Sequence, residues 1–319
     1  MKALVTGATG FIGSSLAEAL VRRGDDVTCL VRATSDRSRL EPLGVRFLFG
    51  DIGQPETITD AVGGFDAVYH LAGLTKAARP EHFFRANAEG AVNLVQALSR
   101  VHGAGRLIYV SSLAAAGPSL DGEAVREETP EHPVSAYGAS KLAGEKAVRA
   151  AGDRVDFTIV RPSAVYGPRD RDFLVIFRAI QRHVFPFWGV SHYSLIYVDD
   201  LVRGIIRAAE HPAAAGETFF LASPEIVTNE EIADAIASAL GRRPLRVPIP
   251  SGLMSLIGAV AQKIDKKGIM NTDRIKDFQY RRWTCDAGKA ARTLGFRPEV
   301  SLREGISWTA DWYRKNRWL

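Results

Sequence analysis

The sequence predicts an α/β fold, with a doubly wound parallel sheet and a smaller C-terminal substrate-binding region. Short apolar runs alternate with helix-length segments through the first half of the chain, which is typical of parallel strands joined by helices. Beyond Arg161 the elements become shorter and rich in proline and aromatic residues. We expect residues 1–165 to form the sheet domain, with later strands interleaved beyond it, and residues 166–319 to form mainly the substrate-binding region. The expected strands are residues 2–5, 27–31, 45–49, 67–70, 107–111 and 157–161.

The composition is that of a soluble globular protein with a sizeable core. Of the 319 residues, 46% are hydrophobic and 24% are charged, and no low-complexity tract or repeat interrupts them. The sequence enters its first strand at once and has no apolar run long enough to cross a bilayer, so we expect a cytoplasmic protein. The net charge of +5 is spread along the chain, which argues against nucleic acid as a partner.

The cysteines and histidines do not have the spacing of a metal site. Cys29 and Cys285 lie far apart in the sequence, and we interpret both as free thiols. The histidines show no HExxH pairing, and we expect no metal. His70 ends an apolar run, which favours a structural role over that of a catalytic base.

One apolar segment, residues 252–261, precedes Lys263, Lys266 and Lys267. A helix packed on the substrate-binding region is the favoured interpretation. Weak contact with a membrane surface is the alternative, because apolar and basic groups together bind the lipid interface.

The first strand runs directly into glycines at positions 7, 10 and 13. The pyrophosphate of a dinucleotide needs backbone N-H groups at close range and the positive end of a helix. Gly7 and Gly10 permit the tight turn, and Gly13 lets the helix expected at residues 11–23 lie against the sheet. The pattern predicts a Rossmann-type dinucleotide site, in which Phe11 and Ile12 open the helix that faces the cofactor.

The end of the second predicted strand bears on the choice of nicotinamide cofactor. An NAD site usually places Asp or Glu there, whereas this chain has Arg32, followed by Ser35, Arg37 and Arg39. Guanidinium groups suit a 2′-phosphate, so the segment favours NADP(H), with NAD(H) as the alternative. A solvated basic loop is the competing interpretation, and Asp36 weakens the positive field.

Two later segments are further candidates for cofactor contacts. Asp51 follows the third predicted strand, where its carboxylate can accept a hydrogen bond from the adenine amine, and Ile52 comes next. Leu71, Ala72 and Gly73 follow the fourth strand and offer small residues beside the cofactor. Ordinary loop structure would explain either segment equally well.

Tyr137 and Lys141 are the predicted catalytic residues, because a spacing of four places them on one face of a helix. A tyrosine with a pKa of about 10 exchanges protons poorly at neutral pH, but a nearby ammonium and an oxidised nicotinamide ring favour its phenolate. Ser112, at a predicted strand end, would hydrogen-bond the substrate oxygen. Together these groups suit hydride transfer at carbon with proton transfer at oxygen.

Several motifs in the first two thirds of the chain together resemble those of the extended short-chain dehydrogenases/reductases. They are Thr6-Gly-Ala-Thr-Gly-Phe-Ile-Gly13, Tyr109-Val-Ser-Ser112, Tyr137-x-x-x-Lys141, Arg161-Pro-Ser-Ala-Val-Tyr-Gly-Pro168 and Tyr197-Val-Asp-Asp200. The resemblance implies a Rossmann domain, Tyr137 as acid/base, Lys141 on the nicotinamide ribose and Ser112 on the substrate. It also implies Asn87 supporting the site from a helix, Pro162 near the nicotinamide, and a homodimer formed through the helices that carry Asn87 and Tyr137.

Members of this family act on nucleotide sugars or on steroids, flavonoids and long-chain keto-lipids, so departures from the family pattern must indicate the substrate. Members that bind nucleotide sugars usually carry Asn where this chain has Ala164, and an Arg in the stretch that is here residues 189–197. The apolar residues between 173 and 187 suit a hydrophobic substrate, or equally a buried helix.

We therefore predict an NAD(P)(H)-dependent oxidoreductase that reduces a ketone, or oxidises the matching secondary alcohol, on a hydrophobic steroid-like or long-chain keto-lipid substrate. The alternative is a nucleotide-sugar epimerase or dehydratase with tightly bound NAD. In that case Arg169, Arg171, Arg178 or Arg182 would hold the diphosphate.

Overall fold

The central element of the fold is a parallel sheet. The computed structural model describes residues 1–58, 62–101, 103–249, 277 and 279–319. Within them this sheet has seven strands in the order β10-β6-β5-β4-β1-β2-β3, and neighbouring strands are parallel throughout. The strands are β1 (Lys2–Thr6), β2 (Asp26–Val31), β3 (Arg46–Phe49), β4 (Ala67–His70), β5 (Arg106–Val110), β6 (Phe157–Pro162) and β10 (Thr218–Leu221).

The six predicted strands are all present, and the predicted fold class is confirmed. Their ends differ from the prediction by at most one residue, because ladder hydrogen bonds set a strand end and the apolar pattern does not report them. The seventh strand, β10, lies beyond residue 165 and pairs with β6. The later part of the chain thus completes the main sheet.

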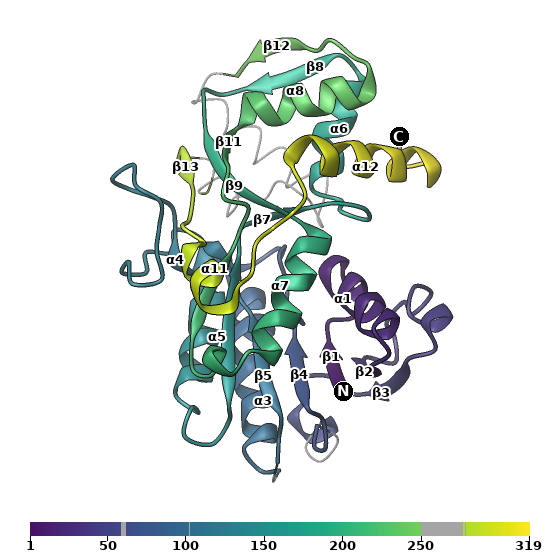
Figure 1. Ribbon diagram of the computed structural model, residues 1–319, viewed down its shortest axis with the longest axis vertical. Helices are drawn as coiled ribbons and strands as arrows, with labels where there is room; N and C mark the ends of the chain where they lie inside the picture. The colour runs from purple at the N-terminus through teal and green to yellow at the C-terminus, as the bar shows by residue number, and fades with distance from the viewer. Residues whose placement is uncertain (59–61, 102, 250–276, 278) are drawn as a thin grey trace.

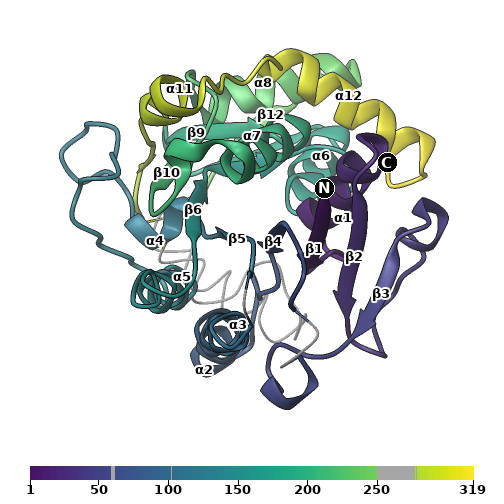
Figure 2. The same cartoon turned by 60° about the horizontal axis from the view of Figure 1, so that its bottom comes forward.

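Helices cover both faces of this sheet (Figures 1 and 2). They are α1 (Phe11–Arg22) and α7 (Val198–Glu210) on one face, and α3 (Gly90–Leu98) and α5 (Ala136–Arg149) on the other. Ala3 and Val5 enter the apolar core under α1 and α7, whereas Leu4 enters the core under α3 and α5. Alternate side chains of a strand point to opposite faces, so an uninterrupted apolar run fits a strand covered on both sides.

A second, smaller region is built mainly from residues beyond β6 (Figure 1). In it β9 (His192–Tyr197) pairs with β7 (Ala164–Tyr166), β11 (Ile226–Thr228) and β13 (Arg282–Trp283), and β8 (Val184–Phe187) pairs with β12 (Leu245–Pro248). Around them pack α6 (Phe173–Gln181), α8 (Asn229–Leu240) and α12 (Leu302–Lys315). That this region binds the substrate stays a prediction.

The apolar stretch at residues 173–187 is divided between α6 and β8. Leu174 and Phe177 are buried, and the Phe177 ring meets Tyr313 of α12 edge-on at 5.1 Å. Val175 and Val184 remain 42% and 38% exposed. Packing within the protein therefore accounts for part of the stretch only.

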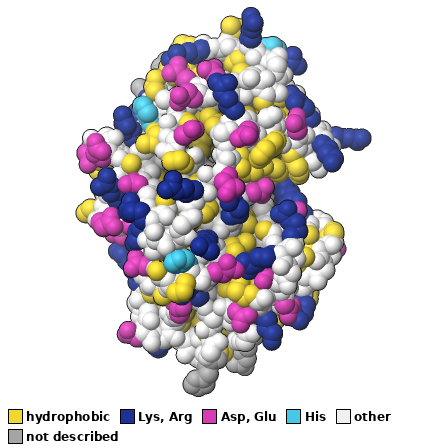
Figure 3. Space-filling view, in the orientation of Figure 1, with side chains coloured by type: hydrophobic (Ala, Val, Ile, Leu, Met, Phe, Trp, Pro, Cys, Tyr) yellow, Lys and Arg dark blue, Asp and Glu magenta, His cyan; other side chains and the backbone are white. Residues whose placement is uncertain are grey.

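Other sequence predictions concern thiols, metals and membranes. Cys29 and Cys285 are both buried and free, as predicted. In the part of the chain that the structure describes, no helix is long and apolar enough to span a membrane, and no cluster of His, Cys, Asp or Glu could hold a metal ion. Residues 252–261 lie outside the described residues. On the face in Figure 3, Lys and Arg side chains are interspersed with Asp and Glu.

Candidate active site

The predicted site residues lie at one edge of the main sheet. Parallel strands have their carboxyl ends at the same edge, and ligands of such sheets bind there. Gly7, Arg32, Asp51, Leu71 and Ser112 follow the ends of β1, β2, β3, β4 and β5, and Pro162 is the last residue of β6, where it pairs with Leu221 of β10. The topology therefore brings together residues that are far apart in the sequence.

The glycine turn after β1 is packed too closely for side chains at Gly7 and Gly13. Gly7 has a φ of +70°, and a methyl group on it would lie 2.5 Å from the backbone nitrogen of Ala72. A methyl group on Gly13 would lie 2.2 Å from the carbonyl oxygen of Gly7. α1 follows Gly10 with no capping side chain and no acidic residue in its first turn. Helix N-H groups without a competing carboxylate fit the pyrophosphate of a dinucleotide.

Phe11 and Ile12, the first residues of α1, are partly buried. Phe11 packs on the core of the smaller region, and Ile12 packs on the core between the main sheet and α1. The N-terminus of α1 therefore lies at the junction of the two regions, where ligand pockets commonly form.

The segment after β4 lies beside the glycine turn. The Leu71 N-H donates to the carbonyl oxygen of Thr6 at 3.2 Å, and the Ala72 N-H donates to the Thr6 hydroxyl at 3.2 Å. A methyl group on Gly73 would lie 2.5 Å from Oδ1 of Asn87. The structure thus places the glycine turn, this segment and Asn87 next to one another.

Asn87 lies in a π-helical turn, η3 (Phe84–Glu89), between α2 (Pro80–Phe83) and α3. Its Oδ1 accepts a hydrogen bond from the Leu74 N-H at 2.7 Å. Its Nδ2 donates to the carbonyl oxygen of Leu74 at 3.0 Å and to Oγ of Ser140 at 2.9 Å. Asn87 therefore ties the loop after β4 to α5.

His70 is 1% exposed at the end of β4. The Thr6 hydroxyl, which accepts the Ala72 N-H, lies within hydrogen-bond distance of Nδ1 of His70, at 2.7 Å. Burial, with a smaller contribution from Lys141, lowers the pKa of His70 to about 3. A neutral buried imidazole fits the predicted structural role.

Acid should destabilise the protein through His70. Its folded pKa lies below the ordinary value of 6.5, so the unfolded state binds more protons in this window and stability falls as the pH falls from about 6.5 towards 3. Urea unfolding at pH 7 and pH 5 should show a loss of about 2 kcal/mol from this group. We expect His70→Gln to remove that component and His82→Gln, at an exposed histidine, to retain it. Equal pH dependence in wild type and His70→Gln would contradict the assignment.

Ser112 and Tyr137 are brought near each other where α4 (Leu113–Ala116) meets α5. Ser112 caps α4, and its Oγ accepts the Ala114 N-H at 3.1 Å. Ser135 caps α5 by accepting the Gly138 N-H at 3.3 Å. A methyl group on Gly138 would lie 2.2 Å from the carbonyl oxygen of Ala114, so the two helices are in backbone contact. Ser112 and Tyr137 are both partly exposed, as contact with a substrate requires.

Lys141 lies one turn beyond Tyr137 on α5 and is 6% exposed. Its Nζ donates to the carbonyl oxygen of Val110 at 2.6 Å and lies 4.6 Å from the centre of the Tyr109 ring. Burial lowers the pKa of Lys141 to about 8, and the charge of Glu145 opposes this shift. The ammonium form therefore predominates at neutral pH, where it can favour the phenolate of a neighbouring tyrosine.

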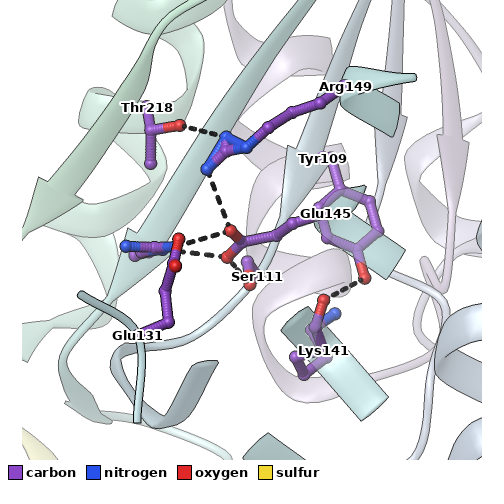
Figure 4. Close-up of polar contacts among 8 residues, drawn as sticks. Tyr109, Ser111, Glu131, Lys141, Glu145, Arg149 and Thr218 are labelled. Carbon is purple, nitrogen blue, oxygen red and sulfur yellow. Dashed lines mark hydrogen bonds and ion pairs between the residues drawn. The ribbon is translucent and has the colours of Figure 1, made fainter. Parts of the chain in front are cut away.

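Glu145 of α5 forms a buried ion pair with Arg161 of β6, which was not predicted from the sequence (Figure 4). The Glu145 carboxylate accepts hydrogen bonds from Nε and Nη2 of Arg161 at 2.9 and 2.7 Å, and neither side chain is exposed. It also accepts from Oγ of Ser111 at 2.5 Å and from Nη2 of Arg149 at 3.2 Å. The one sequence signal for this pair is that Glu145 lies four residues beyond Lys141, on the same face of α5.

Arginines lie on the predicted adenosine side of the site, and one of them, Arg169, donates to Glu18 at 3.0 Å. Arg32 is exposed after β2. Burial and the charges of Arg169 and Arg171 lower the pKa of Arg39, which indicates that these three guanidinium groups lie near one another. Arg169 and Arg171 come from the loop after β7. They are two of the four arginines that would hold the diphosphate of a nucleotide sugar in the alternative function.

Asp51 and Ile52 follow β3 at the same edge of the sheet. Oδ1 of Asp51 accepts the Gly53 N-H at 2.9 Å. Ile52 packs on the core under α3, where a methyl group on Gly90 would lie 2.8 Å from its Cδ1. Both residues therefore have local structural partners, and their contact with a cofactor stays a prediction.

The sequence matches the model of a known protein family. The model of the NAD dependent epimerase/dehydratase family matches residues 3–222. The chain belongs to this family. It is an NAD(P)-dependent enzyme of the extended short-chain dehydrogenase/reductase type, in agreement with the motifs around Gly7, Ser112 and Tyr137.

Proteins similar to this epimerase/dehydratase family member include both reductases and nucleotide-sugar enzymes. It is 33% identical to the ceramide reductase of Caulobacter vibrioides, over 99% of this chain and 95% of that protein. It is 29% identical to the 2-alkyl-3-oxoalkanoate reductase of Stenotrophomonas maltophilia, over 96% and 97% of the two chains. It is 28% identical to the UDP-glucose 4-epimerase of Vibrio cholerae, over 97% and 94%.

Solved structures of similar proteins cover nearly the whole enzyme. The dTDP-glucose 4,6-dehydratase of Streptomyces venezuelae with NAD bound has a TM-score of 0.81 and 27% identity, over 99% of this chain and 98% of that one. The UDP-glucose 4-epimerase of Thermus thermophilus in complex with NAD has a TM-score of 0.80 and 26% identity, over 98% and 99%. Both regions of the fold are therefore shared with this family.

Proposed function

We propose that this enzyme is an NADP(H)-dependent reductase of a ketone on a hydrophobic molecule, such as a steroid-like or long-chain keto-lipid, and that it oxidises the matching alcohol in reverse. The observation that carries the proposal is the backbone contact between α4, which Ser112 caps, and α5, which carries Tyr137 and Lys141. The substrate class is supported by the names of two similar proteins, a ceramide reductase and a 2-alkyl-3-oxoalkanoate reductase.

The roles of the side chains follow from their chemistry. The Tyr137 hydroxyl donates a proton to the ketone oxygen, and the Ser112 hydroxyl holds that oxygen by a hydrogen bond. The Lys141 ammonium stabilises the phenolate that remains on Tyr137. A nicotinamide cofactor, when bound, supplies the hydride. Asn87 keeps the loop after β4 against α5.

The residues proposed to hold the cofactor surround the glycine turn. Gly7, Gly10, Gly13 and the first turn of α1 would bind the pyrophosphate. The nicotinamide and its ribose would lie against Leu71, Ala72, Gly73, Tyr137, Lys141 and Pro162. The adenosine would lie against Asp51 and Ile52, with Arg32 on the 2′-phosphate.

Arg32→Ala should weaken NADPH binding and leave NADH binding unchanged. Loss of one charge-assisted hydrogen bond costs about 1.5–3 kcal/mol, so we expect the Kd for NADPH to rise about 10- to 100-fold. Arg100→Ala is the control, because Arg100 lies beyond α3, at the opposite edge of the sheet from the site. Fluorescence titration with both nucleotides measures the effect. Equal changes for NADPH and NADH would show that Arg32 does not bind the 2′-phosphate.

A nucleotide-sugar epimerase or dehydratase is the second candidate function, and one observation favours it. Ala164 of β7 pairs with Leu195 of β9, and its methyl side chain lacks the amide with which Asn would bind a nucleotide sugar. Arg281, however, donates from Nη1 to Oγ of Ser191 at 3.4 Å, and its guanidinium lies beside Gly189. A guanidinium from another part of the chain thus reaches the stretch at residues 189–197.

A panel of substrates separates the two functions. We expect added NADPH to be oxidised in the presence of a steroid ketone or a long-chain 3-oxoalkanoate ester, and UDP-glucose to show no saturable binding. Binding of UDP-glucose that Arg281→Ala abolishes and Arg282→Ala retains, with the cofactor unchanged after turnover, would favour the epimerase.

We also propose a homodimer formed through the helices that carry Asn87 and Tyr137. Phe84 and Val92, on η3 and α3, are 37% and 36% exposed, and a second copy of the chain could cover them. Light scattering should give the mass of a dimer, and a monomer alone would rule this out.

A further inference from the structure

The Glu145 carboxylate joins the elements that carry the proposed catalytic residues. Ser111, which donates to it, directly precedes Ser112 at the end of β5. Arg161, which pairs with it, lies next to the last residue of β6. Glu145 itself lies one turn beyond Lys141 on α5 (Figure 4). One buried carboxylate therefore sets the spacing between α5 and the ends of both strands.

Glu145 also supplies negative charge beside Lys141. Among the described groups, those that interact with the Lys141 ammonium are His70 from β4, Tyr109 from β5 and Glu145 from α5. Tyr137 lies one turn before Lys141 on α5. Burial lowers the pKa of His70 to about 3 and raises the pKa of Tyr109, so both are neutral at pH 7. Within this set of described groups, Glu145 is the anion when Tyr137 is protonated.

We propose that Glu145 is a positioning residue, whose carboxylate holds Lys141 in its charged form and fixes the ends of β5 and β6 against α5. The inference rests on the proposed function, because the spacing between β5 and α5 affects catalysis only if Ser112 and Tyr137 act on the substrate. Stability alone explains the pair poorly, since a buried ion pair rarely stabilises a fold more than apolar residues of the same volume.

The surroundings of Glu145 determine what its neutralisation would do. Arg161 from β6 and Arg149 from α5 face its carboxylate. Glu131, in the loop before α5, binds Arg161, and Thr218 of β10 binds Arg149. Without the negative charge of Glu145, Arg161 and Arg149 would lose their shared anion, and Lys141 would lose the charge that favours its ammonium form. The ammonium of Lys141 would then lose its proton at a lower pH.

Nuclear magnetic resonance titration of the lysine side chains tests this in the free, full-length enzyme. Lys141→Arg identifies the Lys141 signal, which should titrate near pH 8 in the wild type. In Glu145→Gln the midpoint should fall by about one pH unit or more. In Arg149→Gln, which removes a partly exposed cation, it should rise by about half a pH unit.

Asp200→Asn is the matched control, because it neutralises a buried carboxylate elsewhere. Oδ2 of Asp200 accepts the N-H groups of Glu299 and Val300 at 3.0 and 2.9 Å, and its Oδ1 pairs with Arg203. This variant should lower the melting temperature and leave the Lys141 midpoint unchanged. If Glu145→Gln fails to fold, the opposite shift in Arg149→Gln still tests the inference.

A Lys141 midpoint that stays at the wild-type value in the folded Glu145 and Arg149 variants would overturn the inference. The pH dependence of the rate is the second readout. The rate of ketone reduction should fall at alkaline pH, and in Glu145→Gln this fall should occur at a pH lower by the same amount, with NADPH affinity unchanged. If the wild type reduces no ketone while the Lys141 midpoint shifts as expected, the proposed function fails and the electrostatic role of Glu145 stands.

Discussion

Replacement of Tyr137 by phenylalanine should lower the rate of ketone reduction by about 10²- to 10⁴-fold, the usual contribution of a general acid. Phenylalanine retains the ring, which meets Phe83 edge-on at 5.9 Å, and loses the one hydroxyl proposed to protonate the ketone oxygen. NADPH affinity should change by no more than about twofold, because the substitution removes one hydroxyl and the proposed contacts to the pyrophosphate at the glycine turn remain. Stopped-flow absorbance of NADPH gives the rate, and fluorescence titration gives the affinity.

Tyr313→Phe is the control for this substitution. Its buried hydroxyl donates to the carbonyl oxygen of Asp170 at 2.6 Å, within the smaller region. We expect it to lower the melting temperature and to preserve turnover. Full turnover in Tyr137→Phe would mean that the proton comes from another group, and Tyr137 would lose its assigned role.

Gly13→Ala should abolish cofactor binding. The added methyl group would lie 2.2 Å from the Gly7 carbonyl oxygen and 2.9 Å from Cα of Ala8, both backbone atoms that cannot move without displacing the turn. α1 would have to tilt away from β1, and its N-H groups would no longer face the pyrophosphate position. We expect NADPH affinity to fall by more than about 100-fold, equivalent to two hydrogen bonds to charged groups.

Gly63→Ala is the matched control, because a methyl group there would make ordinary contact with Val101, at 3.4 Å. It should bind NADPH as the wild type does. Circular dichroism must show that Gly13→Ala retains its helices, since α1 also packs on the main sheet. NADPH affinity within about threefold of the wild type in a folded Gly13→Ala protein would contradict the dinucleotide site at this turn.

Most of the main sheet could be predicted from the sequence because its strands are predominantly apolar runs. Residues such as Ala3, Leu4 and Val5 are buried on both faces, which leaves no polar side chain within the run. β10 (Thr218–Leu221) was not among the predicted strands. It lies beyond the first half of the chain, in which apolar runs alternate with helix-length segments, and it pairs with β6.

The site residues at strand ends could also be predicted, because topology alone brings such positions together. The buried pair of Glu145 and Arg161 could not. Charged residues are rarely buried, so the sequence pattern indicates a strand end at Arg161 and a solvated helix face at Glu145. Arg281 was missed for a related reason, since its contact with Ser191 is non-local and a search within residues 189–197 cannot find it.

The fate of a labelled hydride tests the central proposal most directly. The enzyme is incubated with NADPH deuterated at the transferable position of the nicotinamide and with a long-chain 3-oxoalkanoate ester, and both products are analysed by mass spectrometry. We predict one deuterium on the carbinol carbon of the product and one NADP⁺ for each ketone reduced. If no ketone in the panel gives a deuterated alcohol, and UDP-glucose is converted with no net change in cofactor, the reductase is contradicted and the epimerase is supported.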